Sequence, residues 1–434
     1  MTYPKMPDLH GLASRIQLYA QLKHEYGSEN ISVLLEKAEK ELKDVLDRIK
    51  KLPEDEKLKA DEPDDLPGIL KLRTEGPRKL WKTFNEEVYA EKLEGAMLAR
   101  FAGCTLGAIV EGWNVKDMED WAAFIGDGFP PTDYWSKAKD PSQLRYGKSR
   151  NIEYTRDGMN GVPVDDDVTY TLLGLLIAED YGLNFTTEDV GKAWLKYLPC
   201  ACTAEEVALN NLKAGIPAAE AADIDNPYCQ WIGADIRSDP WAYLAPAYPE
   251  KAAEFSYRDA YLSHRRNGIY GEMFFSAVQS AAFAVDNPVD AIKIGLTEIP
   301  RTCALYRDVE WALEAGKGIK NYKDARQAVD ERFKGMHIVH TNNNACLTIF
   351  GLMIGGTDVT KVLSETVAMG LDNDCTAATA GSIVGAIAGK KGVPEHWYKN
   401  FNNTVYSYMT GQEKFKIDDL VSRFTKLAGK VYRQ

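Results

Sequence analysis

The sequence lacks the long apolar runs of membrane proteins and the excess positive charge of nonspecific nucleic-acid binders. None of its apolar runs is long enough to span a bilayer. No long apolar stretch follows the start Met1–Lys5, so we expect no signal peptide and a cytoplasmic protein. The formal net charge is -12, which argues against a nucleic-acid partner. Acidic residues gathered in a cleft would instead favour a divalent cation.

Cysteine spacings that build zinc sites are also missing. Cys200 and Cys202 are separated by one residue, which is too few for a C-x2-C knuckle, and no second pair or nearby histidine accompanies them. The chain has seven cysteines, and their odd number and scattered positions predict reduced, mostly buried thiols in a cytosolic protein.

Strand-like alternation of polar and apolar residues is absent over any useful length, so the predicted fold class is all-α. Capping signals at Thr186–Asp189 and Thr203–Glu206 each predict the start of a helix. The chain has 434 residues, enough for one large domain with an extension.

Residues 1–85 are predicted to form a helical N-terminal extension, and residues 86–434 the main domain. In the extension, apolar residues alternate at spacings of four and three at Ile31, Leu35, Ala38, Leu42, Val45, Ile49 and Leu52. Such a seam permits a coiled coil, but we favour a helix that lies against its own domain. Pro53 should end this helix, and the charged stretch Glu54–Pro67 is a predicted linker or surface loop.

A carboxylate pair, Asp372 and Asp374, precedes a run of small residues that extends to Gly389. We expect that run to form a helix at the centre of the fold, because its short side chains permit close approach. Carboxylates at the start of a buried helix favour Mg²⁺, Mn²⁺ or Ca²⁺ over zinc. The alternative is an aspartate that only caps the helix, with a solvated neighbour.

Three consecutive aspartates, Asp165, Asp166 and Asp167, begin another apolar helix. The helix dipole offsets their mutual repulsion by only a fraction to roughly 1 kcal/mol per group, whereas a dication would offset far more. We therefore favour metal ligands over an acidic surface turn. Glu111 follows a third small-residue helix, and both a surface position and one at a cavity edge fit it.

Two segments between these motifs carry candidate substrate-binding residues. Gly233 and Arg237 belong to a glycine-led turn that could present backbone N–H groups and a guanidinium to phosphate. His264, Asn267 and Gly268 precede another small-residue helix, where a lone histidine is more often structural than functional.

The helix before Glu111, the Asp165–Asp167 helix start and Asp372–Asp374 resemble, in order and spacing, the motifs of the ADP-ribosylglycohydrolase family. The resemblance covers roughly residues 88 to 400, and the first 85 residues lie outside it. It implies a compact all-α domain with two metal ions, usually Mg²⁺ and with Mn²⁺ as the alternative. It also implies hydrolysis of the bond between C1″ of ADP-ribose and a protein side chain or another ribose.

By this resemblance, the metal ligands are Asp165, Asp166, Asp167, Asp372 and Asp374. Glu111 corresponds to a cleft glutamate that contacts metal or acts in catalysis. The Gly233–Arg237 turn lies where the family holds the phosphates of its substrate.

Three positions depart from the family pattern. Asp165 stands where the family has Ser or Thr, Cys375 where it often has Thr, and Cys104 where it has Asp. A thiol is a poor ligand for Mg²⁺. The departures bear on substrate identity more than on metal binding.

The resemblance leads us to expect a metal-dependent glycoside hydrolase in which Glu111 is the general base or proton shuttle. One alternative is a glycosidase or nucleoside-type hydrolase acting on a smaller glycoside. The other is a non-catalytic, crystallin-like protein, which the retained carboxylates disfavour. The sequence does not indicate an oligomeric state.

Overall fold

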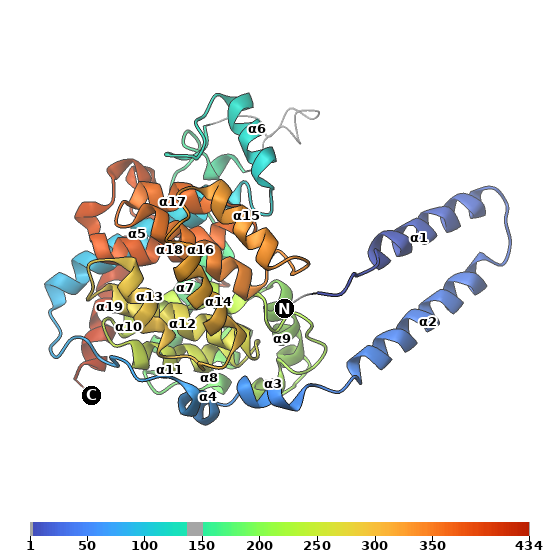
Figure 1. The fold of residues 1–434 in the computed structure, drawn as a ribbon, viewed down its shortest axis with the longest axis horizontal. Coiled ribbons are helices and arrows are strands. Elements are labelled where there is room, and N and C mark those ends of the chain that lie inside the picture. Colours follow the sequence, from blue (N-terminus) through green and yellow to red (C-terminus); the bar gives the residue numbers. More distant parts are fainter. Residues whose placement is uncertain (1–2, 137–150, 434) are drawn as a thin grey trace. The chain divides into compact units, whose positions relative to one another are not determined.

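The computed structural model describes residues 3–136 and 151–433 and confirms the predicted all-α class (Figure 1). In these residues the only strands are β1 (Thr404–Tyr406) and β2 (Lys414–Lys416), which pair antiparallel. Among the same residues, none of the helices combines the length and apolarity needed to cross a bilayer.

The chain divides into two compact units, Met1–Ala60 and Asp61–Gln434. In the first unit lie α1 (Leu9–Glu25), α2 (Ile31–Lys50) and most of α3 (Glu56–Asp61). The heptad seam lies on α2, which ends shortly before Pro53, as expected from the sequence. Neither α1 nor α2 contains a buried residue.

The second unit contains the remaining helices. The first are α4 (Leu66–Leu72), α5 (Glu86–Ala108), α6 (Val115–Ile125), α7 (Asp166–Tyr181), α8 (Thr187–Tyr197) and α9 (Thr203–Lys213). Next are α10 (Asp239–Leu244), α11 (Pro249–Ala260), α12 (Asn267–Ala282), α13 (Pro288–Leu296), α14 (Ala304–Ala315) and α15 (Tyr322–Arg332). The last are α16 (Thr341–Gly355), α17 (Val359–Ala368), α18 (Asn373–Ala388) and α19 (Ile417–Val431). Short 3-10 turns include η4 (Ile232–Arg237).

The segment between Asp61 and α5 is tied to the second unit by buried ion pairs. The Glu62 side chain is 2% exposed and accepts hydrogen bonds from Arg266 and Asn267. Arg73 and Arg78 both pair at 2.7 Å with Glu298, whose side chain is 1% exposed. The two compact units thus divide between Ala60 and Asp61. From the sequence, we expected the extension to end later, near residue 85.

The two small-residue helices α5 and α18 pack backbone to backbone. A Cβ added to Gly103 would lie 2.2 Å from the carbonyl oxygen of Ala377, and one added to Gly107 would lie 2.4 Å from the Cα of Asp374. Real Cβ atoms are not found at such distances, so only glycine permits this approach. The contact brings the C-terminal end of α5 against the start of α18, which carries the Asp372–Asp374 motif.

A fully buried guanidinium connects these helices to α7. Arg100 of α5 donates from Nη2 to the backbone oxygens of Asp167 (2.9 Å) and Ile236 (2.6 Å). Its Nε lies 3.1 Å from Oδ2 of Asp239. Arg100 therefore fixes the first turn of α7 against α5 and against the η4–α10 junction.

Candidate metal centre

The three consecutive aspartates occupy the N-terminus of α7, as the sequence predicted. Asp165 is the N-cap, and its side chain accepts a 3.0 Å hydrogen bond from the backbone N–H of Asp167. Asp165 and Asp166 are partly buried, while Asp167 is 0% exposed. One oxygen of Asp165 therefore caps the helix, and its other oxygen and the next two aspartates are left for other interactions.

The second carboxylate motif sits on a strained turn before α18. Leu371 has φ +62°, a conformation that costs a bulky residue free energy and is concentrated at functional sites. Asp372 is the N-cap residue of α18, yet its side chain makes no capping hydrogen bond. The backbone N–H of Gly112 donates to the Leu371 carbonyl at 2.9 Å, which places the neighbouring Glu111 beside this turn.

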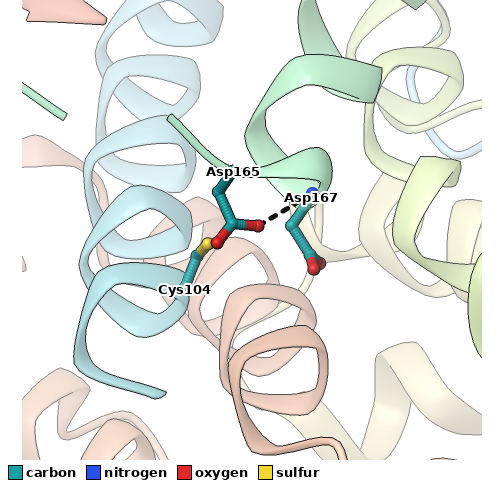
Figure 2. A group of neighbouring side chains, drawn as sticks. All are labelled: Cys104, Asp165 and Asp167. Carbon is teal, nitrogen blue, oxygen red and sulfur yellow. Dashed lines mark hydrogen bonds between the residues drawn. The ribbon is translucent and has the colours of Figure 1, made fainter. Parts of the chain in front are cut away.

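The structure brings these motifs together in three overlapping groups of potential ligands. The groups are Cys104, Asp165 and Asp167; Asp167, Asp374 and Cys375; and Glu111, Asp372 and Asp374. Within each group, one ligand atom from every residue lies within 4.8 Å of the others. Figure 2 shows the first group, with Cys104 from α5 beside the carboxylate of Asp165, the N-cap of α7, and with Asp167 from the first turn of α7. Asp167 and Asp374 each belong to two groups, so the three form one continuous cluster.

The carboxylates of this cluster are protonated more readily than usual. Burial, then the charge of Asp374, raises the pKa of Asp165, Asp167 and Asp372 well above the ordinary range. The charge of Asp374, then burial and the charge of Asp166, raises the pKa of Glu111 to about 8. These shifts reflect burial and mutual repulsion between the carboxylates, and a bound dication would reduce that repulsion.

Several carboxylate oxygens in the cluster also lack hydrogen-bond partners. Buried Oδ1 atoms of Asp167, Asp372 and Asp374 accept no hydrogen bond. Buried polar atoms are rarely left so, since each costs about 1–3 kcal/mol. These oxygens and the acidic donor set fit one or more divalent cations.

A cavity of about 190 Å³ opens onto the cluster. It is lined by Glu111, Asp166, Tyr170, Cys202, Thr203, Glu205, Trp231, Ile232, Gly233, Ile236, Val339, Asp372, Asp374 and Cys375. The Trp231 indole stacks on the His337 ring, with centroids 4.0 Å apart and planes 14° apart. Among the described residues that line the cavity none is Lys or Arg, and most are acidic, aromatic or aliphatic.

Of the five predicted substrate-binding residues, Gly233 lines this cavity, and the other four are not among its lining residues. Arg237 is 1% exposed and pairs at 2.7 Å with both Glu205 and Asp259. Its guanidinium is therefore engaged by two carboxylates, one of which, Glu205, lines the cavity, and is not directed into the cavity.

The His264 segment has structural contacts. His264 is 0% exposed, and its Nδ1 lies 2.8 Å from Oγ of Ser263. The Asn267 side chain bonds Glu62 and the backbone N–H of Leu305. Gly268 passes so close to the Cys229 carbonyl that a Cβ would lie 2.4 Å from it.

Sequence reasoning did not identify several residues of the cavity wall, notably Tyr170, Cys202, Glu205, Trp231 and Val339. In the sequence, Glu205 carries only the signal of a helix start. Trp231 immediately precedes the glycine-led turn, and this adjacency was the one available signal. The others come from segments that only the fold brings together.

Comparisons with known proteins identify one family. A family model described as ADP-ribosylglycohydrolase matches residues 85–433. One solved structure that is similar to this chain is titled ADP-ribosylglycohydrolase-related protein complex. The similarity covers 80% of this chain and 99% of the chain in that structure. The two chains share 18% sequence identity, with a TM-score of 0.48. Among curated proteins, none matches.

Proposed function

The chain belongs to the ADP-ribosylglycohydrolase family, and on that premise we propose that it is a metal-dependent hydrolase that cleaves a ribosyl glycosidic bond in an ADP-ribosylated substrate. The observation that carries the proposal is the convergence of carboxylates from α7, α18 and the loop after α5 on one cavity. Family membership supports the glycohydrolase type of reaction, and the convergence supports its metal dependence.

The carboxylates divide into two roles in this proposal. Asp165, Asp167, Asp372 and Asp374 would hold the cations, and Asp166 on the cavity wall would complete the set. Bound dications, expected from the sequence to be Mg²⁺ or Mn²⁺, would supply Lewis acidity and fix sugar hydroxyls. The remaining negative charge of the wall would stabilise the oxocarbenium character that develops at C1″.

Glu111 is our candidate for proton transfer. Its side chain is exposed to solvent on one side and adjoins Asp372 and Asp374 on the other. A carboxylate in that position can take a proton from an attacking water and return it to bulk solvent. Its pKa of about 8 without cations would fall when cations bind, because they neutralise Asp374, and this would leave the base form at neutral pH.

The cavity constrains the substrate. Pockets for drug-sized ligands are roughly 300–1,000 Å³, so a cavity of about 190 Å³ admits a sugar-sized group and leaves the rest of a larger substrate outside. Trp231 offers an aromatic face at its wall.

A second candidate is hydrolysis of a smaller, uncharged glycoside. The observation in its favour is the absence of Lys and Arg among the lining residues, because a diphosphate normally meets cationic side chains or backbone N–H groups. In this second candidate, the metal ligands and the attack of water on C1″ would be the same as in the first.

The test is a substrate panel assayed with Mg²⁺, with Mn²⁺ and with a chelator. It should contain peptides ADP-ribosylated on arginine or serine, a ribose-linked ADP-ribose dimer, and simple ribosides. We expect release of ADP-ribose from one ADP-ribosylated substrate, abolished by the chelator. Turnover of simple ribosides alone would favour the second candidate, and chelator-resistant turnover would reject the metal mechanism.

A further inference from the structure

We infer that Cys104 and Cys375 place two thiols in the candidate metal centre and make it selective for a thiophilic dication, represented by Zn²⁺, over Mg²⁺. The inference rests on the proposed metal-dependent function and specifies its cation. It starts from the arrangement of donors around Asp167, which is the one residue shared by the two thiol-containing groups.

The two thiols approach Asp167 from different helices. The Sγ of Cys375, on α18, donates a 3.1 Å hydrogen bond to Oδ2 of Asp167. Cys104, on α5, lies within 4.8 Å of carboxylate oxygens of both Asp165 and Asp167 (Figure 2). The other oxygen of Asp167, Oδ1, is buried and accepts no hydrogen bond. Nη2 of Arg100 lies 3.7 Å from this oxygen. Each of the two ligand groups that share Asp167 contains one sulfur, so a cation in either group would have one thiol among its possible ligands.

Helix packing fixes the positions from which both thiols extend. Cys104 lies between Gly103 and Gly107, the two glycines at which α5 touches the backbone of α18, and it is 1% exposed. Cys375 directly follows Asp374 in the first turn of α18 and is 8% exposed. Backbone contact on both helices thus fixes the direction of both Cα–Cβ bonds.

Other buried cysteines of the chain have backbone partners instead. The Cys303 Sγ accepts from the backbone N–H of Tyr306, and the Cys346 Sγ donates to the Asp308 carbonyl. Only Cys104 and Cys375 face carboxylates among the buried cysteines of the described chain.

The chemistry of these donors separates the cations. Mg²⁺ prefers six oxygen ligands in near-octahedral geometry, and thiolate sulfur is a soft ligand that favours Zn²⁺ and other first-row transition metals. A bound thiophilic cation would displace the thiol protons to solvent, since thiolate is the ligating form. Each Cys–S–H would become Cys–S–metal with release of one proton and no oxidation or reduction.

The experiment uses the full-length, metal-free protein with Zn²⁺, Mg²⁺ and Co²⁺ as probes. Calorimetric titration in two buffers of different ionisation enthalpy measures both affinity and proton release. We expect Zn²⁺ to bind at least about 100-fold more tightly than Mg²⁺, with release of protons. Co²⁺ should produce a sulfur-to-cobalt charge-transfer band in the near ultraviolet.

Variants Cys104→Ser and Cys375→Ser should each weaken the band and lower the ratio of Zn²⁺ to Mg²⁺ affinity about tenfold or more. Cys200→Ser, an exposed cysteine outside the cavity lining, is the matched control and should change neither. If Cys104→Ser fails to fold, Cys375→Ser and the wild-type band still test the inference.

Absence of the band, together with unchanged affinities in both site variants, would overturn the thiol assignment and leave the hydrolase proposal intact. Conversely, a strong band in a protein that hydrolyses no glycoside with any cation would support the thiol centre and reject the proposed function.

Discussion

Arg100 and Asp239 form an ion pair in which neither side chain is exposed to solvent: Nε of Arg100 lies 3.1 Å from Oδ2 of Asp239. The same guanidinium donates to the backbone oxygen of Asp167 and lies 3.7 Å from its Oδ1. Asp239 accepts a further 2.6 Å hydrogen bond from Thr171, one turn along α7 from Asp167. The Arg100–Asp239 pair thus helps to hold Asp167, a central carboxylate of the candidate metal centre, in position.

We predict that Arg100→Met destabilises the protein by about 3–5 kcal/mol, because it leaves the buried Asp239 without its cation. Asp239→Asn should cost less in the Arg100→Met background than in the wild type. Urea denaturation of the two single variants and the double variant measures the coupling between the residues. Additive effects would show that the pair does not act as a unit.

Asp374→Asn and Glu111→Gln should fail in different ways. Asp374 belongs to two ligand groups, so its amide variant should bind cations more weakly and regain part of its activity at high metal concentration. Glu111→Gln removes a proton carrier, so turnover should fall by roughly 10²–10⁴-fold and extra metal should not restore it. Metal titrations of both variants distinguish these outcomes, and full rescue of Glu111→Gln would reassign Glu111 as a ligand.

The metal-free protein should lose stability as pH rises from about 5 to about 8. Folding raises the pKa of Glu111 from 4.5 to about 8 and that of Asp165, Asp167 and Asp372 above their ordinary range. In this window the folded state binds more protons than the unfolded state, so the free energy of unfolding falls with increasing pH.

Thermal unfolding across that window, with and without a saturating dication, measures the effect. The cation should flatten the pH dependence of stability. In the metal-free protein, Glu111→Gln should make the decrease of stability with pH shallower. Stability of the metal-free protein that is constant or increases with pH would contradict the electrostatic description of the site.

Truncation should separate the two compact units at residue 60. A chain of residues 61–434 retains Glu62, Arg73 and Arg78, and we expect it to fold and bind metal. A chain of residues 86–434 leaves the buried Glu298 without either arginine, which should cost about 3–5 kcal/mol. Chemical denaturation of both chains provides the comparison, and equal stabilities would show that residues 61–85 do not contribute to the larger unit.

Gly107→Ala should impair the metal centre although Gly107 carries no side chain. The added Cβ would lie 2.4 Å from the Cα of Asp374. Helices α5 and α18 must therefore move apart at Asp374, which is one of the proposed metal ligands. We expect metal affinity to fall about tenfold or more, together with a lower melting temperature. Gly128→Ala, whose Cβ would meet nothing within 4 Å, is the control. Wild-type affinity in Gly107→Ala would show that the contact is not needed to place Asp374.

Local signals in the sequence predicted the all-α class and the starts of α7, α8 and α9, although α9 has Cys202 as its N-cap and no side-chain capping bond. Thr186 and Asp189 form the expected capping box, and Asp165 caps its helix. The approach of Asp167 to Asp374 followed from the family resemblance, because no local signal relates residues so far apart in sequence.

The roles of Arg237 and Arg100 were harder to predict. A guanidinium near a glycine-led turn suggests a phosphate site, but Arg237 is engaged by Glu205 and Asp259, which come from two other helices. Arg100 lies in an apolar helix with no local sign of its partners Asp239 and Asp167. Burial of a charged residue depends on which elements surround it, and sequence spacing does not contain that information.

The backbone contact between α5 and α18 has a consequence for how this centre can change. Because Gly103 and Gly107 touch α18 directly, the distance between the two helices is set by main-chain atoms and cannot be adjusted by enlarging or trimming a side chain. Exchange of donor atoms at a fixed spacing remains available, since the side chains of Cys104 and Cys375 are buried beside carboxylates at this spacing. Redesign of the cation preference should therefore succeed by replacing ligands and fail by reshaping the helices that carry them.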